Sequence, residues 1–221
     1  MNTLTVSLRL AWRALTQNIL TSLIAVFTVS LSGGLFLGAW KTKQTVNLAF
    51  AQSAGGFDAV LGARGSQLQL VLNALFHLEN SPGNLDWSQY ETIRSHPGVS
   101  EAYPFALGDN YLGYRIVGTT PDLFVHHQWK PGTNYQVHPP GRIFADHAKE
   151  AIVGAQVAAE IGLKLGDRFH PYHGLEYNPD TRHEDIHLVV GLLETTGTPV
   201  DQVIWVPLKG VQMMEGHDAS S

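Results

Sequence analysis

One uncharged, apolar stretch near the N-terminus constrains this chain more than any other feature. From Asn18 to Trp40 no residue is charged, and most side chains are apolar. As a helix, these 23 residues would reach about 34 Å, which is enough to cross a hydrocarbon core of roughly 30 Å. We therefore expect a transmembrane helix over residues 18–40, with the lipid bilayer as a partner.

The residues before this stretch have a helical pattern of their own. Within residues 1–17, apolar side chains recur on one helical face: Leu4, Leu8, Ala11, Trp12 and Leu15. Arg9 and Arg13 lie beside that face. The pattern predicts a basic helix lying at the membrane interface, and the alternative is a simple N-terminal extension of the membrane helix.

A cleaved signal peptide is the competing interpretation of the apolar stretch. Ala49-Phe50-Ala51 has the small-x-small shape of a cleavage site. However, the apolar run exceeds the usual length, and Lys41 and Lys43 lie between it and that site. We therefore expect an uncleaved anchor. Two basic residues flank each end, so orientation rests on the large domain that follows, which we expect to be translocated.

The rest of the composition excludes several classes of function. Residues 1–43 hold four of the 14 Lys and Arg and no acid, so the remaining chain is strongly acidic, with all 19 Asp and Glu. Nucleic acid is therefore not an expected partner, because phosphate binding needs clustered basic residues. The chain has no cysteine, no P-loop motif and no G-x-S-x-G motif. We expect no enzyme activity, no catalytic residue and no cofactor.

After the span, residues 41–56 predict a helical stalk that ends at Gly55-Gly56. Residues 57–211 predict one α+β core domain, and residues 212–221 form a tail. A helix is expected over Ala155–Ile161, ended by Gly162, and another near Asp86.

Other local patterns predict strands and turns. Strands are expected at 57–60, at 151–153, from 186 to the glycine at 191, and at 203–206. Gly108-Asp109-Asn110 has the composition of a turn between two further strands.

Histidine is abundant, with 11 residues, and one motif stands out. His183-Glu184-Asp185-Ile186-His187 fits H-E-x-x-H, which binds zinc when it lies on a helix. Here a turn precedes the motif and a β-branched run follows it, so we expect a polar loop meeting a strand instead of a zinc hydrolase. No metal site is assigned. The weak candidates for one are His170, His173, His183 and His187, and the alternative is that they are surface histidines on polar loops.

Two groups of segments together resemble a known family. The first comprises LAWRALTQNILTSLIAVFTVSLSGGLFLGAW and FDAVLGARGSQLQLVLNALFH, and the second comprises KEAIVGAQVAAEIGLKLGDRF and HLVVGLLETTGTPVDQVIWVPL. Their order and spacing are similar to those of permease subunits of MacB/FtsX-type ABC transporters. The resemblance covers most of the chain, and the matching glycines have scaffold roles.

The resemblance implies a fold and a function. It implies an α+β extracytoplasmic domain on one N-terminal transmembrane helix, in a bacterial cytoplasmic (inner) membrane. The subunit would couple cytoplasmic ATP hydrolysis to movement of that domain, for export, lipoprotein handling or mechanotransmission. Its implied partners are a cytoplasmic ABC ATPase subunit and a second permease subunit, as a dimer. Three further membrane helices are expected in the family, so the chain resembles a fragment. The alternative function is a membrane-anchored metal-binding or sensor module that uses the His-rich loops.

Overall fold

The structure is a computed structural model that describes residues 3–53 and 55–212. The chain divides into two compact units, Met1–Phe50 and Ala51–Ser221, and each is described by itself. The expected tail falls outside the described residues except for Gln212.

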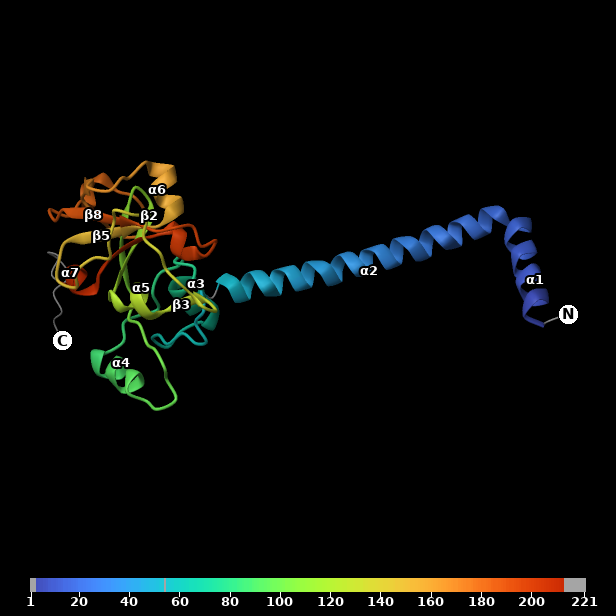
Figure 1. The fold of residues 1–221 in the computed structure, drawn as a ribbon, viewed down its shortest axis with the longest axis horizontal. Helices are drawn as coiled ribbons and strands as arrows, with labels where there is room; N and C mark the ends of the chain where they lie inside the picture. Colours follow the sequence, from blue (N-terminus) through green and yellow to red (C-terminus); the bar gives the residue numbers. More distant parts are fainter. Residues whose placement is uncertain (1–2, 54, 213–221) are drawn as a thin grey trace. The chain divides into compact units, whose positions relative to one another are not determined.

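The first unit consists of α1 (Thr3–Gln17) and most of α2 (Ile19–Ser53) (Figure 1). α2 has 35 residues and is about 52 Å long. Its segment Ile19–Thr45 is long and apolar enough to cross a membrane and is not buried within the structure. Such a helix suits a membrane span or a signal sequence. The hydroxyl of Thr28 donates to the carbonyl of Ile24 at 2.8 Å, so this polar group is satisfied within the helix.

The second unit is a mixed α/β domain built on a seven-stranded sheet. The strands of this sheet are β1 (Ala106–Tyr111), β2 (Tyr114–Thr119), β5 (Glu150–Val153), β6 (Arg168–Phe169), β7 (Tyr172–His173), β8 (His187–Leu192) and β9 (Ile204–Pro207). A separate hairpin contains β3 (Gln128–Lys130) and β4 (Thr133–Asn134). The helices are α3 (Gln67–Ala74), α4 (Trp87–Arg94), α5 (Asp122–His126), α6 (Ala155–Ile161) and α7 (Leu208–Gln212), with 3-10 turns η1 (Pro179–Thr181) and η2 (Pro199–Gln202).

The sheet curls so that its two ends come close together. Its strand order is β6-β8-β5-β9-β2-β1-β7, with β2/β9 and β5/β8 parallel and the other pairs antiparallel. The two edge strands, β6 and β7, are separated in sequence by His170 and Pro171 alone. Three Cα steps limit the distance from Phe169 to Tyr172 to about 11 Å. The region where the two edges meet is called the seam below. Tyr111 packs across it, with its ring 4.8 Å from that of Phe169.

Apolar side chains cover both faces of the sheet. On β9, Ile204 belongs to one buried cluster and Trp205 to the other, as successive strand residues point to opposite faces. Ile116 and Val117 divide in the same way on β2. Burial on both faces explains why the central strands are nearly continuous apolar runs. In contrast, α4 has no buried residue and projects from the body of the domain (Figure 1).

Several local predictions are confirmed. α6 has the expected bounds, and Gly162 ends it in the left-handed conformation with φ 74°. α2 ends before Gly55 and Gly56, which have φ 59° and 85°. α4 begins after Asp86 as expected.

Three local predictions are wrong. Gly108-Asp109-Asn110 lies inside β1, and the turn falls at Leu112-Gly113, both with positive φ. Residues 57–60 form no strand. Gly191 does not end β8 but lies within it. The position suits glycine because a Cβ there would lie 2.6 Å from the carbonyl oxygen of Arg142.

Gly154 offers a sharp test of packing beside the sheet. Its φ of −61° and ψ of 147° suit any residue, yet a Cβ would lie 2.5 Å from the carbonyl oxygen of Asp201. We expect Gly154→Ala to lower the free energy of unfolding by about 2 kcal/mol, because η2 must move. Denaturant unfolding would measure this. Gly210→Ala is the matched control, since its Cβ would meet nothing closer than 3.4 Å, and equal losses for both variants would contradict the steric account.

Candidate functional site

A carboxylate and two imidazoles meet at the seam. Oδ1 of Asp109 lies 3.3 Å from Nδ1 of His173 and 3.4 Å from Nε2 of His183. These ligand-type atoms all lie within 4.8 Å of one another. We call Asp109, His173 and His183 the seam triad. Among the described residues it is the group of three or more His, Asp and Glu whose donor atoms come close enough to share a metal ion.

Strand pairing brings the first two members together. β1 and β7 pair antiparallel, with Asp109 opposite His173 and Asn110 opposite Tyr172. Directly opposed residues in such a pair present their side chains on the same face of the sheet. The turn after β7 is fixed by a backbone hydrogen bond from Gly174 N to Gly108 O at 2.8 Å.

Asn110 fixes the chain that carries His173. Its side chain is fully buried, and its Nδ2 lies within hydrogen-bond distance of three carbonyl oxygens, those of Tyr172, Gly174 and Glu176, at 3.3, 2.9 and 3.1 Å. Its Oδ1 accepts from Gly113 N at 3.2 Å. One buried amide therefore ties the β1–β2 turn to the segment after β7.

The third member comes from the loop before β8. His183 N donates to the carbonyl of Pro171 at 2.9 Å, and Tyr172 forms an isolated bridge with Arg182. Nδ1 of His170 lies 3.1 Å from the carbonyl oxygen of His183. The loop between β7 and β8 therefore returns to the seam, where it places His183 beside Asp109.

The burial of the triad is graded. The side chain of Asp109 is 2% exposed and that of His183 is 10% exposed, whereas that of His173 is 61% exposed. The carboxylate therefore lies at the base, and solvent reaches the group from the side of His173. A buried carboxylate needs positive charge or hydrogen bonds around it, and a protonated imidazole or a metal ion would supply the charge.

Of the four weak histidine candidates, the structure brings two together. His173 and His183 belong to the triad, whereas His170 contacts the backbone of His183 instead. His187 begins β8 and is fully buried, stacked on Phe169 at 5.7 Å. Asp109 is the member that sequence reasoning missed. Its neighbours Gly108 and Asn110 made it resemble a turn residue, and strand pairing alone places it opposite His173.

The H-E-x-x-H segment is not helical. Residues 183–186 form a loop and His187 enters a strand, as the flanking residues predicted. His183 faces the seam triad while His187 lies in the core. Asp185 forms an ion pair with Lys149. The zinc-protease arrangement, with both imidazoles on one helical face, is therefore not present.

A second group of contacts lies just after α2. Nε2 of His127 donates to the carbonyl of Gly55 at 2.6 Å, and the ring of Phe57 stacks on that imidazole at 4.2 Å. Nδ1 of His127 lies 3.3 Å from a carboxylate oxygen of Glu101. We call Gly55, Phe57, Glu101 and His127 the joint, because they attach the start of the domain to α5. A Cβ at Gly56 would lie 2.3 Å from the carbonyl of Gln128, so the backbone passes very close here.

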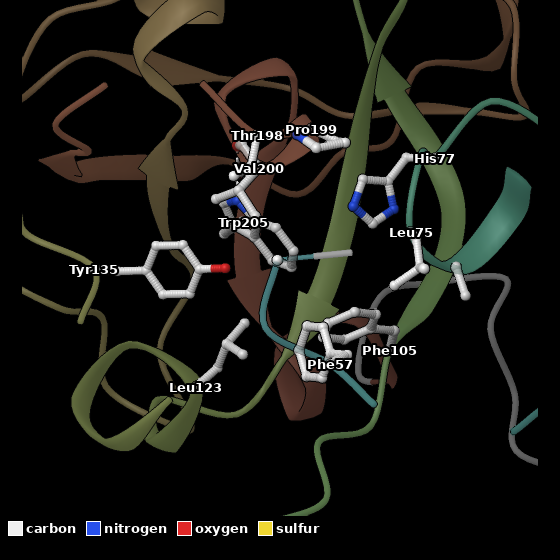
Figure 2. Close-up of a pocket in the computed structure, with 12 residues that line it drawn as sticks. Phe57, Leu75, His77, Phe105, Leu123, Tyr135, Thr198, Pro199, Val200 and Trp205 are labelled. Atoms are coloured by element: carbon white, nitrogen blue, oxygen red, sulfur yellow. Dashed lines mark hydrogen bonds between the residues drawn. The ribbon is translucent and has the colours of Figure 1, made fainter. Parts of the chain in front are cut away.

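One hollow of the domain is apolar and small. Phe57, Phe105, Leu123, Val200 and Trp205 line it together with His77 and Tyr135 (Figure 2). The space open to the centre of a water molecule is about 20 Å³. That is room for a water molecule and not for an organic ligand. No member of the seam triad lines it.

Comparisons with known proteins do not extend the resemblance noted in the sequence. Neither protein-family models nor curated protein sequences match this chain.

The burial of two histidines predicts that the folded domain loses stability in acid. Burial lowers the pKa of His77 and that of His187 to about 4, from an ordinary value of 6.5. Between these values the unfolded chain binds protons that the folded chain does not. The free energy of unfolding is therefore undiminished above pH 6.5. It falls as the pH decreases towards 4, by up to roughly 3 kcal/mol for each imidazole.

Replacing one of these imidazoles tests that prediction. Neither ring nitrogen of His187 has a hydrogen-bond partner among the described residues, so His187→Phe should keep the stacking on Phe169. Urea unfolding of the full chain in detergent at pH 5 and pH 7.5 should show a smaller pH difference in this variant. The control is His138→Gln, at an exposed histidine. An unchanged pH difference in His187→Phe would contradict the assignment.

Proposed function

We propose that this chain is the first membrane helix and the extracytoplasmic domain of a permease subunit of the MacB/FtsX type. In this proposal, ATP hydrolysis by a cytoplasmic partner subunit drives movement of the outer domain, for export, lipoprotein handling or mechanotransmission. The observation that carries the proposal is the order of the family-like segments, which follow an apolar helix long enough to cross a membrane.

The joint supports the proposal in one limited way, because it fixes the beginning of the domain in place. Gly55 accepts a hydrogen bond from Nε2 of His127, and the ring of Phe57 stacks on the same imidazole.

The placement of the family-like segments gives further support. KEAIVGAQVAAEIGLKLGDRF contributes β5, α6 and β6, and HLVVGLLETTGTPVDQVIWVPL contributes β8, η2 and β9. β8, β5 and β9 are adjacent in the sheet, and β5 and β9 are buried apart from the partly exposed Glu150. The resemblance therefore lies in the scaffold of the domain and does not identify a substrate.

The turn between β8 and β9 is also built as part of that scaffold. The buried carboxylate of Asp201 accepts hydrogen bonds from the backbone N–H groups of Thr196 and Gly197, at 2.8 to 3.1 Å, and from the Thr196 hydroxyl. These contacts fix the segment TTGTPVD, which belongs to the second group of family-like segments.

The absence of cysteine from the sequence allows a direct test of topology. We propose Ser7→Cys in α1 and Ser95→Cys after α4, both at exposed positions, as single-cysteine variants. In intact spheroplasts, a membrane-impermeant maleimide should label Ser95→Cys, and it should label Ser7→Cys only after permeabilisation. The reverse pattern would contradict the orientation, and release of the domain into the soluble fraction would indicate a cleaved leader.

The native gene provides the test of the class itself. We expect the reading frame to continue past Ser221 with three further apolar segments, and a neighbouring gene to encode a P-loop ATPase that co-purifies with the permease. A stop codon after Ser221 and no such ATPase gene nearby would overturn the proposal.

A further inference from the structure

We propose that the seam triad, Asp109, His173 and His183, binds a divalent transition-metal ion of the zinc class and thereby fastens the two ends of the curled sheet together. The site is independent of the permease function, since it depends on the outer domain alone.

Two separations within the triad match those between two donors on one metal ion, and the contact from Nε2 of His183 is also a long hydrogen bond. Zinc bonds to imidazole nitrogen and carboxylate oxygen are about 2.0 to 2.1 Å long, so two donors on one tetrahedral ion lie about 3.3 to 3.4 Å apart. The observed separations from Oδ1 of Asp109 are 3.3 and 3.4 Å. A charge-assisted hydrogen bond would be shorter, at about 2.7 to 2.9 Å.

The donor set indicates the class of ion. Two imidazole nitrogens and one carboxylate oxygen suit zinc and its neighbours in the transition series. Magnesium and calcium instead prefer sites made mainly of oxygen ligands, in six or more positions. Three protein ligands leave a fourth tetrahedral position, as in open zinc sites, and the exposed side at His173 gives the ion a route of entry.

The backbone holds the three ligands in place without help from an ion. Asp109 and His173 are fixed by strand pairing and by the buried amide of Asn110. His183 is fixed by the hydrogen bond from its backbone N–H to Pro171. Ligands held in this way lose little conformational entropy on binding, which favours affinity.

The position of the site gives binding a structural consequence. Asp109 belongs to β1 and His173 to β7, at one end of the sheet, whereas His183 leads into β8, which pairs with the opposite edge strand β6. An ion bound by all three would add a link between these parts to the packing of Tyr111 against Phe169. Metal binding should therefore protect the backbone amides of the loop between β7 and β8 from hydrogen exchange.

The experiment uses the full chain without an affinity tag, purified in detergent and treated with EDTA. Titration with zinc chloride should show one ion bound per chain with micromolar or tighter affinity, whereas magnesium and calcium should not bind. Cobalt should give the visible absorption of a tetrahedral site. Zinc should also raise the unfolding temperature and slow hydrogen exchange over residues 171–183.

Three variants and a matched control identify the ligands. Asp109→Asn, His173→Gln and His183→Gln should each weaken zinc binding by about 100-fold or more and abolish the cobalt spectrum, since loss of a direct ligand should cost at least as much as loss of an outer-shell partner. His126→Gln removes an exposed histidine of α5 and should bind zinc as the parent chain does.

The outcomes are decisive even if one variant fails to fold. Asp109 is buried, but His173 is mostly exposed, so His173→Gln should keep the parent unfolding temperature without metal. The proposal is overturned if the parent chain binds no zinc at micromolar concentrations. It is equally overturned if folded His173→Gln binds zinc and cobalt unchanged, which would place the ion elsewhere in the chain.

Discussion

The closure of the curled sheet is the constraint on which the rest of the α/β domain depends. Two residues, His170 and Pro171, connect its edge strands, so the ends of a seven-stranded sheet must lie close together. Helical residues pack on both faces of this sheet, with Phe124 of α5 in one buried cluster and Val157 of α6 in the other, so both faces become buried. The edge strands are only two residues long, which limits the unpaired backbone that they expose.

Polar contacts are concentrated beside the seam. The fully buried amide of Asn110 is hydrogen-bonded to the segment after β7 and to the turn after β1. Beside it, the carboxylate of Asp109 faces two imidazoles. Buried polar groups specify one arrangement because any other leaves them unsatisfied, at a cost of about 1 to 3 kcal/mol each. The proposed metal site at the seam rests on the same geometry.

α2 and the α/β domain differ in which side chains they bury. α2 satisfies its backbone within itself and exposes apolar side chains, as a helix in lipid must. The α/β domain instead buries its apolar side chains in two clusters, one on each face of its sheet.

The sequence by itself determined the features whose cause is local. An uncharged run of sufficient length predicts the long apolar helix, and Gly162 predicts the end of α6, because hydropathy and backbone freedom act over a few residues. The tertiary structure alone decided the site. Asp109 resembles a turn residue until pairing sets it opposite His173, and His187 resembles a ligand until the sheet buries it against Phe169. Residues from positions 109, 173 and 183 meet because the sheet closes, and no spacing in the sequence encodes that closure.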